Sequence, residues 1–119
     1  MKALCLKQPY ASWVADGSKI IETRTWKTSY RGKFLVVASR SIDLLQELEL
    51  PIENFPLGRA LCIAKLAHCR PMTEQDEREA CCERYEGAWA WILSAVWKIK
   101  SFPVKGQLRF FEVEYGEDV

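Results

Sequence analysis

Apolar residues along this chain recur in short runs that predict β-strands separated by a few short helices. Runs rich in valine, isoleucine, threonine and aromatic residues, bounded by glycine, proline or polar clusters, are typical of strands. Such runs occur at residues 1–6, 19–26, 34–38, 59–68, 88–93, 96–99 and 108–115. The pattern therefore predicts about six strands, most of them joined by short connections.

Helical spacing predicts three short helices between these strands. Residues 8–9 open the first helix, because proline suits the first helical turn, and Gly17 is placed to end it. Ser41 can cap a second helix that continues to residue 50. Thr73 begins a capping-box pattern and a charged third helix that we expect to reach about residue 84.

Strands and helices in this order make an α+β pattern. Because the strands mostly follow one another by hairpins or short excursions, we expect a small barrel rather than a doubly wound sheet. The chain of 119 residues suits a single domain, residues 1–119.

Composition and charge narrow the function classes. Hydrophobic residues make up 49% of the chain and charged residues 28%, as in ordinary globular proteins. A net charge of +1 argues against a polybasic nucleic-acid binder but leaves room for a local basic cleft. The sequence contains no secretory signal and no run of about 18 apolar residues that could span a membrane. We therefore expect a cytoplasmic protein with no membrane partner.

The cysteines and the single histidine do not form a recognisable metal motif. Five cysteines are present without any C-x-x-C spacing, and Cys81 and Cys82 are adjacent. Adjacent thiolates rarely reach one tetrahedral ion, and His68 is the only histidine. We predict reduced thiols, no metal site and no cofactor.

The segment from Gly17 to Arg24 is the strongest candidate for chemistry, because it places three ionisable side chains within six residues. Period-2 geometry puts Glu22, Arg24 and Trp26 on one strand face, where Glu22 and Arg24 can pair. Lys19 lies near the preceding turn and can reach the same place. The segment is either a solvated strand face with a weak surface ion pair or the floor of a polar pocket.

Two further groups allow the same pair of interpretations. Arg31 follows Lys27 in a polar turn that is either an anion-binding site or an ordinary hairpin turn. Trp89 and Trp91 share a strand face and form either a stacking platform or part of the core, with Trp97 further along. The acidic residues between 74 and 86 are expected on the solvated face of their helix.

Taken together, these motifs resemble the ASCH domain, the activating signal cointegrator-1 homology domain of the PUA-like superfamily. The matching blocks are Leu6-Lys7-Gln8-Pro9-Tyr10-Ala11, Gly17-x-Lys19-x-x-Glu22-x-Arg24, Tyr30-Arg31-Gly32, Ala38-Ser39, Trp89-x-Trp91-Ile92-Leu93, Pro103-x-x-Gly106 and Phe110-Phe111-Glu112-Val113. The resemblance implies a PUA-like, mostly antiparallel β-barrel with helices at its edges. It also implies a protein that binds RNA, or nucleic acid more broadly, by recognising a base or nucleotide in a polar cleft.

Carried over from the family, Lys19, Glu22 and Arg24 would form the floor of this cleft. Arg31 and Ser39 would lie on its wall, with Trp91 nearby. All six residues are therefore candidate ligand-binding residues.

Enzymatic alternatives use the same cleft. One bacterial branch resembles amidohydrolases that deacetylate N4-acetylcytidine with a lysine, a threonine and a downstream glutamate. Lys19 matches the lysine, but Glu22 stands at the threonine position, and the downstream glutamate has several candidates between Glu74 and Glu86. Lys19 and Glu22 could still act as an acid/base pair, in such a hydrolase or in a ribonuclease. A third alternative is a vestigial pocket in a protein that makes protein–protein contacts.

Overall fold

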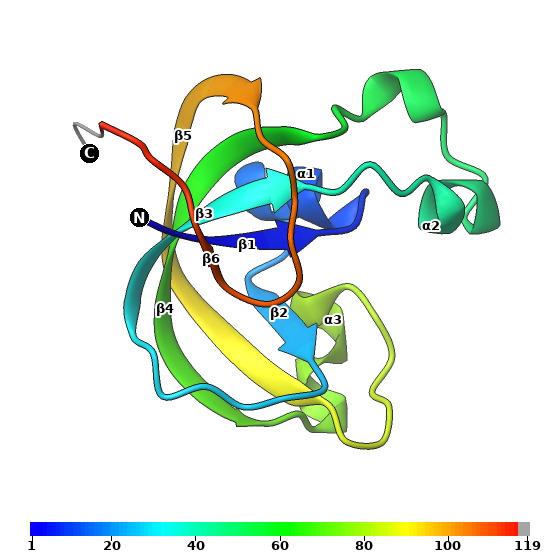
Figure 1. The fold of residues 1–119 in the computed structure, drawn as a ribbon. Helices are drawn as coiled ribbons and strands as arrows, with labels where there is room; N and C mark the ends of the chain where they lie inside the picture. The colour runs from blue at the N-terminus through cyan, green and yellow to red at the C-terminus, as the bar shows by residue number, and fades with distance from the viewer. Residues whose placement is uncertain (117–119) are drawn as a thin grey trace.

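A single curved sheet organises the molecule (Figure 1). The computed structural model describes residues 1–116, and within them six strands lie in the order β2-β5-β4-β3-β1-β6. The strands are β1 Lys2–Leu6, β2 Ile21–Arg24, β3 Gly32–Ala38, β4 Arg59–Pro71, β5 Trp89–Pro103 and β6 Phe111–Glu112. Neighbouring strands are antiparallel except for β1 and β3, which run parallel.

The α+β class and the mostly antiparallel sheet are confirmed, but the barrel is open. β2 and β6 are the two edges of the sheet and do not pair with each other in the described part of the chain. The expected strands 88–93 and 96–99 form one strand, β5, because no glycine or proline separates them. Register shifts between β4 and β5 accompany the strong curvature of this pair (Figure 1).

The final strand and the third helix are shorter than expected. Only Phe111–Glu112 of the expected strand 108–115 pairs, because the preceding residues leave the sheet and Arg109 has a φ of +56°. The helices are α1 Tyr10–Ala15, α2 Asp43–Glu47 and α3 Glu77–Ala80, with 3-10 turns at Ile52–Asn54 and Glu74–Asp76. α3 ends at Ala80, four residues early, because Cys81 adopts a left-handed conformation with a φ of +57°.

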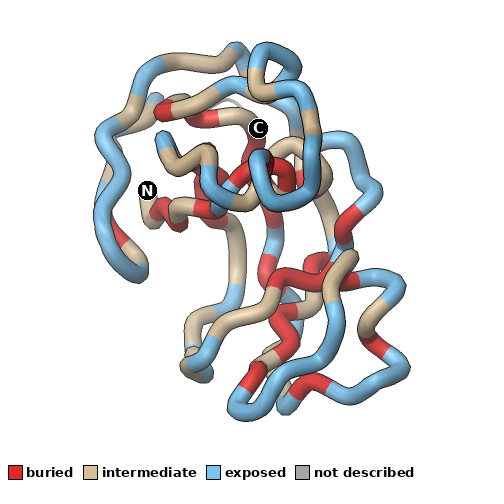
Figure 2. Tube along the Cα trace, turned by 90° about the vertical axis from the view of Figure 1, so that its right-hand side faces the viewer, coloured by how far each residue is buried: buried red, intermediate tan, exposed pale blue. Residues whose placement is uncertain are grey.

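Apolar side chains pack on both faces of the sheet. In β3 the buried run Phe34–Ala38 alternates, so Phe34 and Val36 join the α1 side whereas Leu35 and Val37 join the other side. Ala11 and Val14 of α1 are fully buried on the first side. Figure 2 shows the buried positions as short stretches separated by intermediate and exposed ones along the chain. This two-sided core fixes the strand ends around which the site is built.

Candidate functional site

A tight turn after α1 sends Lys19 into the protein. Gly17 has a φ of +86°, which glycine adopts without steric cost, and its N–H donates to the Val14 carbonyl at 3.2 Å. The Lys19 N–H then donates to the Trp13 carbonyl at 3.0 Å. The strand β2 begins two residues later, so Lys19 lies before the strand rather than on it.

Lys19 is completely buried and has three partners that suit a cation. Its Nζ donates a hydrogen bond to the Ala80 carbonyl at the end of α3. The same Nζ lies 3.7 Å from Glu22 Oε1 and 4.4 Å from the centre of the Tyr10 ring. These contacts offset the desolvation of the ammonium group, which would otherwise be very costly.

Glu22 links Lys19 to Arg24. Glu22 Oε2 lies 3.1 Å from Arg24 Nε, as an ion pair without hydrogen-bond alignment. Arg24 Nη2 donates to the Cys5 carbonyl at 2.7 Å and so ties β2 to β1. The alternation of β2 places both side chains on one face, as the sequence predicts. One carboxylate between two cations leaves the cluster with a net positive charge.

A cavity of about 1070 Å³ opens in front of this cluster. Its walls come from the ends of β1 and β3, from β2, from the residues after α3 and from the segment before β6. In Figure 1 that last segment descends from the end of β5 across the ends of β3 and β1. The lining residues are Cys5, Leu6, Lys7, Tyr10, Glu22, Thr23, Arg24, Ala38, Ser39, Arg40, Gly58, Cys82, Tyr85, Lys105, Gly106, Gln107, Leu108 and Arg109.

The lining is strongly cationic although the whole chain is almost neutral. Its cationic residues are Lys7, Arg24, Arg40, Lys105 and Arg109. Glu22 is the one carboxylate in this lining among residues 1–116. The cavity is therefore suited to an anionic or oxygen-rich ligand.

Two tyrosines add aromatic surface to the cavity. Burial, together with the smaller effects of the neighbouring Cys82 and Glu22, raises the pKa of Tyr10 to about 12. The phenol therefore stays protonated at neutral pH and can donate a hydrogen bond. Tyr85 lies after α3 and is 38% exposed.

The other predicted site residues are distributed unevenly. Ser39 lines the cavity, and its Oγ accepts a hydrogen bond from the Ser41 N–H at 3.0 Å. Arg31 is exposed and folds back on its own turn, donating to the carbonyls of Thr28 and Tyr30, outside the cavity lining. Trp91 is fully buried in the core and is likewise absent from the lining.

Lys19 also lies behind the cavity wall rather than in it. The structure thus brings Lys19, Glu22 and Arg24 into one cluster, of which Glu22 and Arg24 reach the cavity. Of the two interpretations left open for Trp91, the structure favours core packing: the ring packs edge-on against Trp26 with ring centres 4.8 Å apart.

Sequence reasoning missed the segment of residues 105–109, which supplies five lining residues. Pro103 and Gly106 are typical turn residues and entered only as a block of the family resemblance, and nothing local places this segment against β1. Arg109 lies over the Trp26 ring with its guanidinium carbon 4.6 Å from the ring centre. Two further lining residues were missed. Lys7 directly follows β1, and Arg40 lies two residues after β3.

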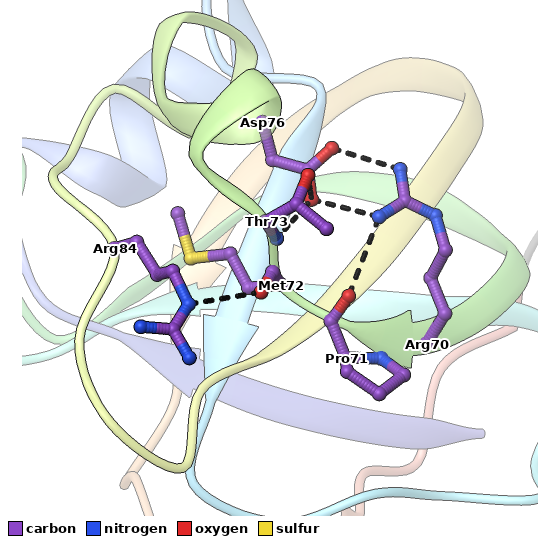
Figure 3. Close-up of polar contacts among 6 residues, drawn as sticks. All are labelled: Arg70, Pro71, Met72, Thr73, Asp76 and Arg84. Atoms are coloured by element: carbon purple, nitrogen blue, oxygen red, sulfur yellow. Dashed lines mark hydrogen bonds and ion pairs between the residues drawn. The ribbon is translucent and has the colours of Figure 1, made fainter.

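A polar network holds α3 and the residues after it in place (Figure 3). Arg70 forms a two-point ion pair with Asp76, at 2.7 and 2.8 Å, and Asp76 accepts the Thr73 N–H at 2.8 Å in the predicted capping box. The hydrogen bonds from Arg70 lower the pKa of Asp76 to about 2. Arg84 Nε donates to the Met72 carbonyl at 3.2 Å. This network fixes the element that presents the Ala80 carbonyl to Lys19.

The described residues contain neither a metal-binding group nor a spanning helix. No three His, Cys, Asp or Glu side chains within residues 1–116 are grouped so that they could hold a metal ion. No helix in that part of the chain is long and apolar enough to cross a membrane. The five cysteines carry free thiols.

One family model matches this chain, and the fold is similar to solved structures. Residues 4–103 match the ASCH domain. The fold is similar to the crystal structure of ASCH from Zymomonas mobilis, with a TM-score of 0.70 and 14% identity, covering 95% of this chain and 87% of that one. A mutant form of the Zymomonas mobilis protein gives a TM-score of 0.61 and 13% identity, covering 95% and 89% of the two chains. No curated protein matches the sequence.

Proposed function

This chain belongs to the ASCH domain family, and from that premise we propose that it binds RNA by taking a base or nucleotide into the cavity. The observation that carries the proposal is the Glu22–Arg24 pair, which faces a cationic cavity of about 1070 Å³. Such a volume suits a small organic ligand the size of a nucleotide.

The lining offers the contacts that base recognition needs. Arg24 uses Nη2 on the Cys5 carbonyl and directs Nε toward Glu22, which leaves further guanidinium donors for a base carbonyl. Tyr10 and Ser39 supply hydroxyl groups, and the exposed Tyr85 ring offers a surface on which a base can stack. Glu22 has a cation on each oxygen, so its main role in this proposal is to orient Arg24.

Binding fits the geometry better than catalysis by the lysine, threonine and glutamate set. Glu22 replaces the threonine, and Lys19 lies behind Glu22 with its Nζ engaged by the Ala80 carbonyl. Of residues 74–86, Cys82 and Tyr85 line the cavity, whereas the glutamates of that range are not part of the lining. Turnover of a modified nucleoside or of RNA remains the alternative function, and it is assayed beside binding.

The test is the affinity of the chain for single-stranded RNA and for nucleotides, measured by titration calorimetry. Arg24→Ala should weaken binding by about tenfold or more, because a charge-assisted hydrogen bond is lost. The fold should survive, because Glu22 still neutralises the buried Lys19. Arg31→Ala is the matched control, since Arg31 is an exposed arginine outside the cavity lining.

Two results would oppose the proposal. Equal losses in Arg24→Ala and Arg31→Ala would assign binding to general surface charge. Cleavage of RNA or hydrolysis of a modified nucleoside, lost in Lys19→Met while the protein remains folded, would favour the enzymatic alternative.

A further inference from the structure

Arg40 and Lys105 both line the cavity, and both belong to segments that contact Gly58. The Gly58 N–H donates to the Ala38 carbonyl at 2.9 Å, and the Gly58 carbonyl accepts the Val104 N–H at 3.0 Å. Gly58 therefore joins the end of β3, which leads to Arg40, to the segment that leads to Lys105. Both cations line the cavity and both are exposed.

Glycine at position 58 makes this arrangement possible. Gly58 has a φ of +63°, and a Cβ built there would lie 2.8 Å from Arg40 Nε and 3.1 Å from Arg40 Cγ. The Arg40 side chain thus lies directly over the Gly58 backbone, where any other residue would displace it. We call Arg40, Gly58 and Lys105 the cationic corner.

The cationic corner lacks the neutralisation that the Glu22 cluster has. Arg24 and Lys19 share the Glu22 carboxylate, whereas no carboxylate of residues 1–116 lies within ion-pair distance of Arg40 or Lys105. Two cations that line one cavity without an anion raise its positive potential. A ligand anion would be attracted by that potential and could accept charge-assisted hydrogen bonds from these side chains.

The cationic corner and the Glu22–Arg24 pair are connected through Gly106. A Cβ on Gly106 would lie 2.6 Å from Cys5 Sγ, so this glycine packs directly on Cys5. Cys5 in turn accepts the hydrogen bond from Arg24 Nη2 at 2.7 Å. Lys105 directly precedes Gly106, which packs on Cys5, the residue that accepts the Arg24 hydrogen bond. Both parts line the same cavity.

We infer that the ligand of this cavity carries a phosphate group, which binds at the cationic corner while the base lies against Glu22 and Arg24. This inference rests on the proposed function and assigns the ligand class: a nucleotide or an RNA strand in preference to a free nucleoside. A guanidinium fork can bind two phosphate oxygens, and an ammonium group adds a point charge. The cavity should therefore distinguish ligands by the presence of a phosphate group as well as by the base.

The experiment compares each of the four common ribonucleosides with its 5′- and 3′-monophosphates and with short single-stranded RNA. A monophosphate should bind about tenfold or more tightly than its nucleoside. Arg40→Gln and Lys105→Gln should each remove about five- to tenfold of nucleotide affinity and lower the salt dependence of RNA binding by about one charge. Neither variant should change nucleoside affinity. Lys65→Gln, on an exposed part of β4 outside the cavity lining, is the control.

The outcomes separate the two proposals. Equal affinity for nucleoside and monophosphate, or equal losses for both ligands in Arg40→Gln, would overturn the phosphate assignment and leave base binding intact. If only RNA binds, an unchanged RNA affinity in Arg40→Gln and Lys105→Gln would overturn it as well. Failure of every nucleoside, nucleotide and RNA to bind would reject the proposed function itself.

Discussion

Replacing Glu22 with glutamine should expose how strongly the buried Lys19 depends on that carboxylate. Lys19 is completely buried, and the Glu22 side chain is only 7% exposed. Glu22→Gln keeps the side-chain shape but removes the charge. The Lys19 ammonium would then lose its ionic partner and would keep the neutral Ala80 carbonyl and the Tyr10 ring.

The size of the effect follows from the separation of the charges. Opposite charges 3.7 Å apart attract by about 4 kcal/mol at an effective dielectric constant of about 20. Breaking a buried ion pair on one side typically costs about 3 to 5 kcal/mol. We expect a loss of about 3 kcal/mol in the free energy of unfolding, because the Ala80 carbonyl still satisfies one ammonium N–H. That is a large part of the roughly 5 to 15 kcal/mol that stabilises a typical domain.

A double-mutant cycle in urea denaturation, followed by tryptophan fluorescence, measures this dependence. Lys19→Met removes the buried cation and leaves Glu22 with Arg24. The double variant should be more stable than the sum of the single losses implies, with a coupling energy of at least about 1 kcal/mol. Glu53→Gln, at an exposed glutamate, should change stability by less than about 0.5 kcal/mol. Additive losses in the cycle would refute the idea that Lys19 and Glu22 stabilise each other.

Three further predictions concern the network, the loop and the thiols. Asp76→Asn should lower stability at pH 7 by about 1 to 2 kcal/mol. The ionised Asp76, with a folded-state pKa of about 2, stabilises the fold above about pH 4, and this stabilisation is lost as the pH falls toward 2. Urea denaturation across that pH range tests the prediction. Gly106→Ala should lower stability by about 1 to 2 kcal/mol through its contact with Cys5 Sγ, and Cys5→Ala should restore part of the thermal stability. Burial raises the pKa of Cys62 to about 12, so this thiol should resist a disulfide reagent at pH 8. Cys82 lines the cavity, so it should react with the reagent and should be protected by a saturating nucleotide.

Each of these has a result that would contradict it. If the difference in the free energy of unfolding between wild type and Asp76→Asn did not shrink between pH 4 and pH 2, the stabilisation would not come from this carboxylate. Full stability of Gly106→Ala would mean that the segment moves freely away from Cys5. Modification of Cys62 in the folded protein would contradict its burial, and equal labelling of Cys82 with and without nucleotide would place the ligand elsewhere.

Local sequence patterns determined the parts of the site that depend on neighbouring residues. The alternation of a strand puts Glu22 and Arg24 on one face, and the glycine at position 17 makes the turn that directs Lys19 inward. The capping box at Thr73 was equally readable, because its partners are three residues apart. The same local motifs carried the family resemblance.

Only the tertiary structure decided which side chains share the cavity. Lys19 donates to Ala80, 61 residues away, which buries it behind the wall instead of in it. Residues 105–109 reach the site because Gly106 packs on Cys5, and no local pattern encodes that contact. Arg31 has the right charge and motif but folds onto its own turn. The sequence by itself therefore determined the Glu22–Arg24 pair, since adjacency along one strand defines it. The depth of Lys19 and the cationic corner required the packing of distant segments, whose contacts depend on the whole sheet.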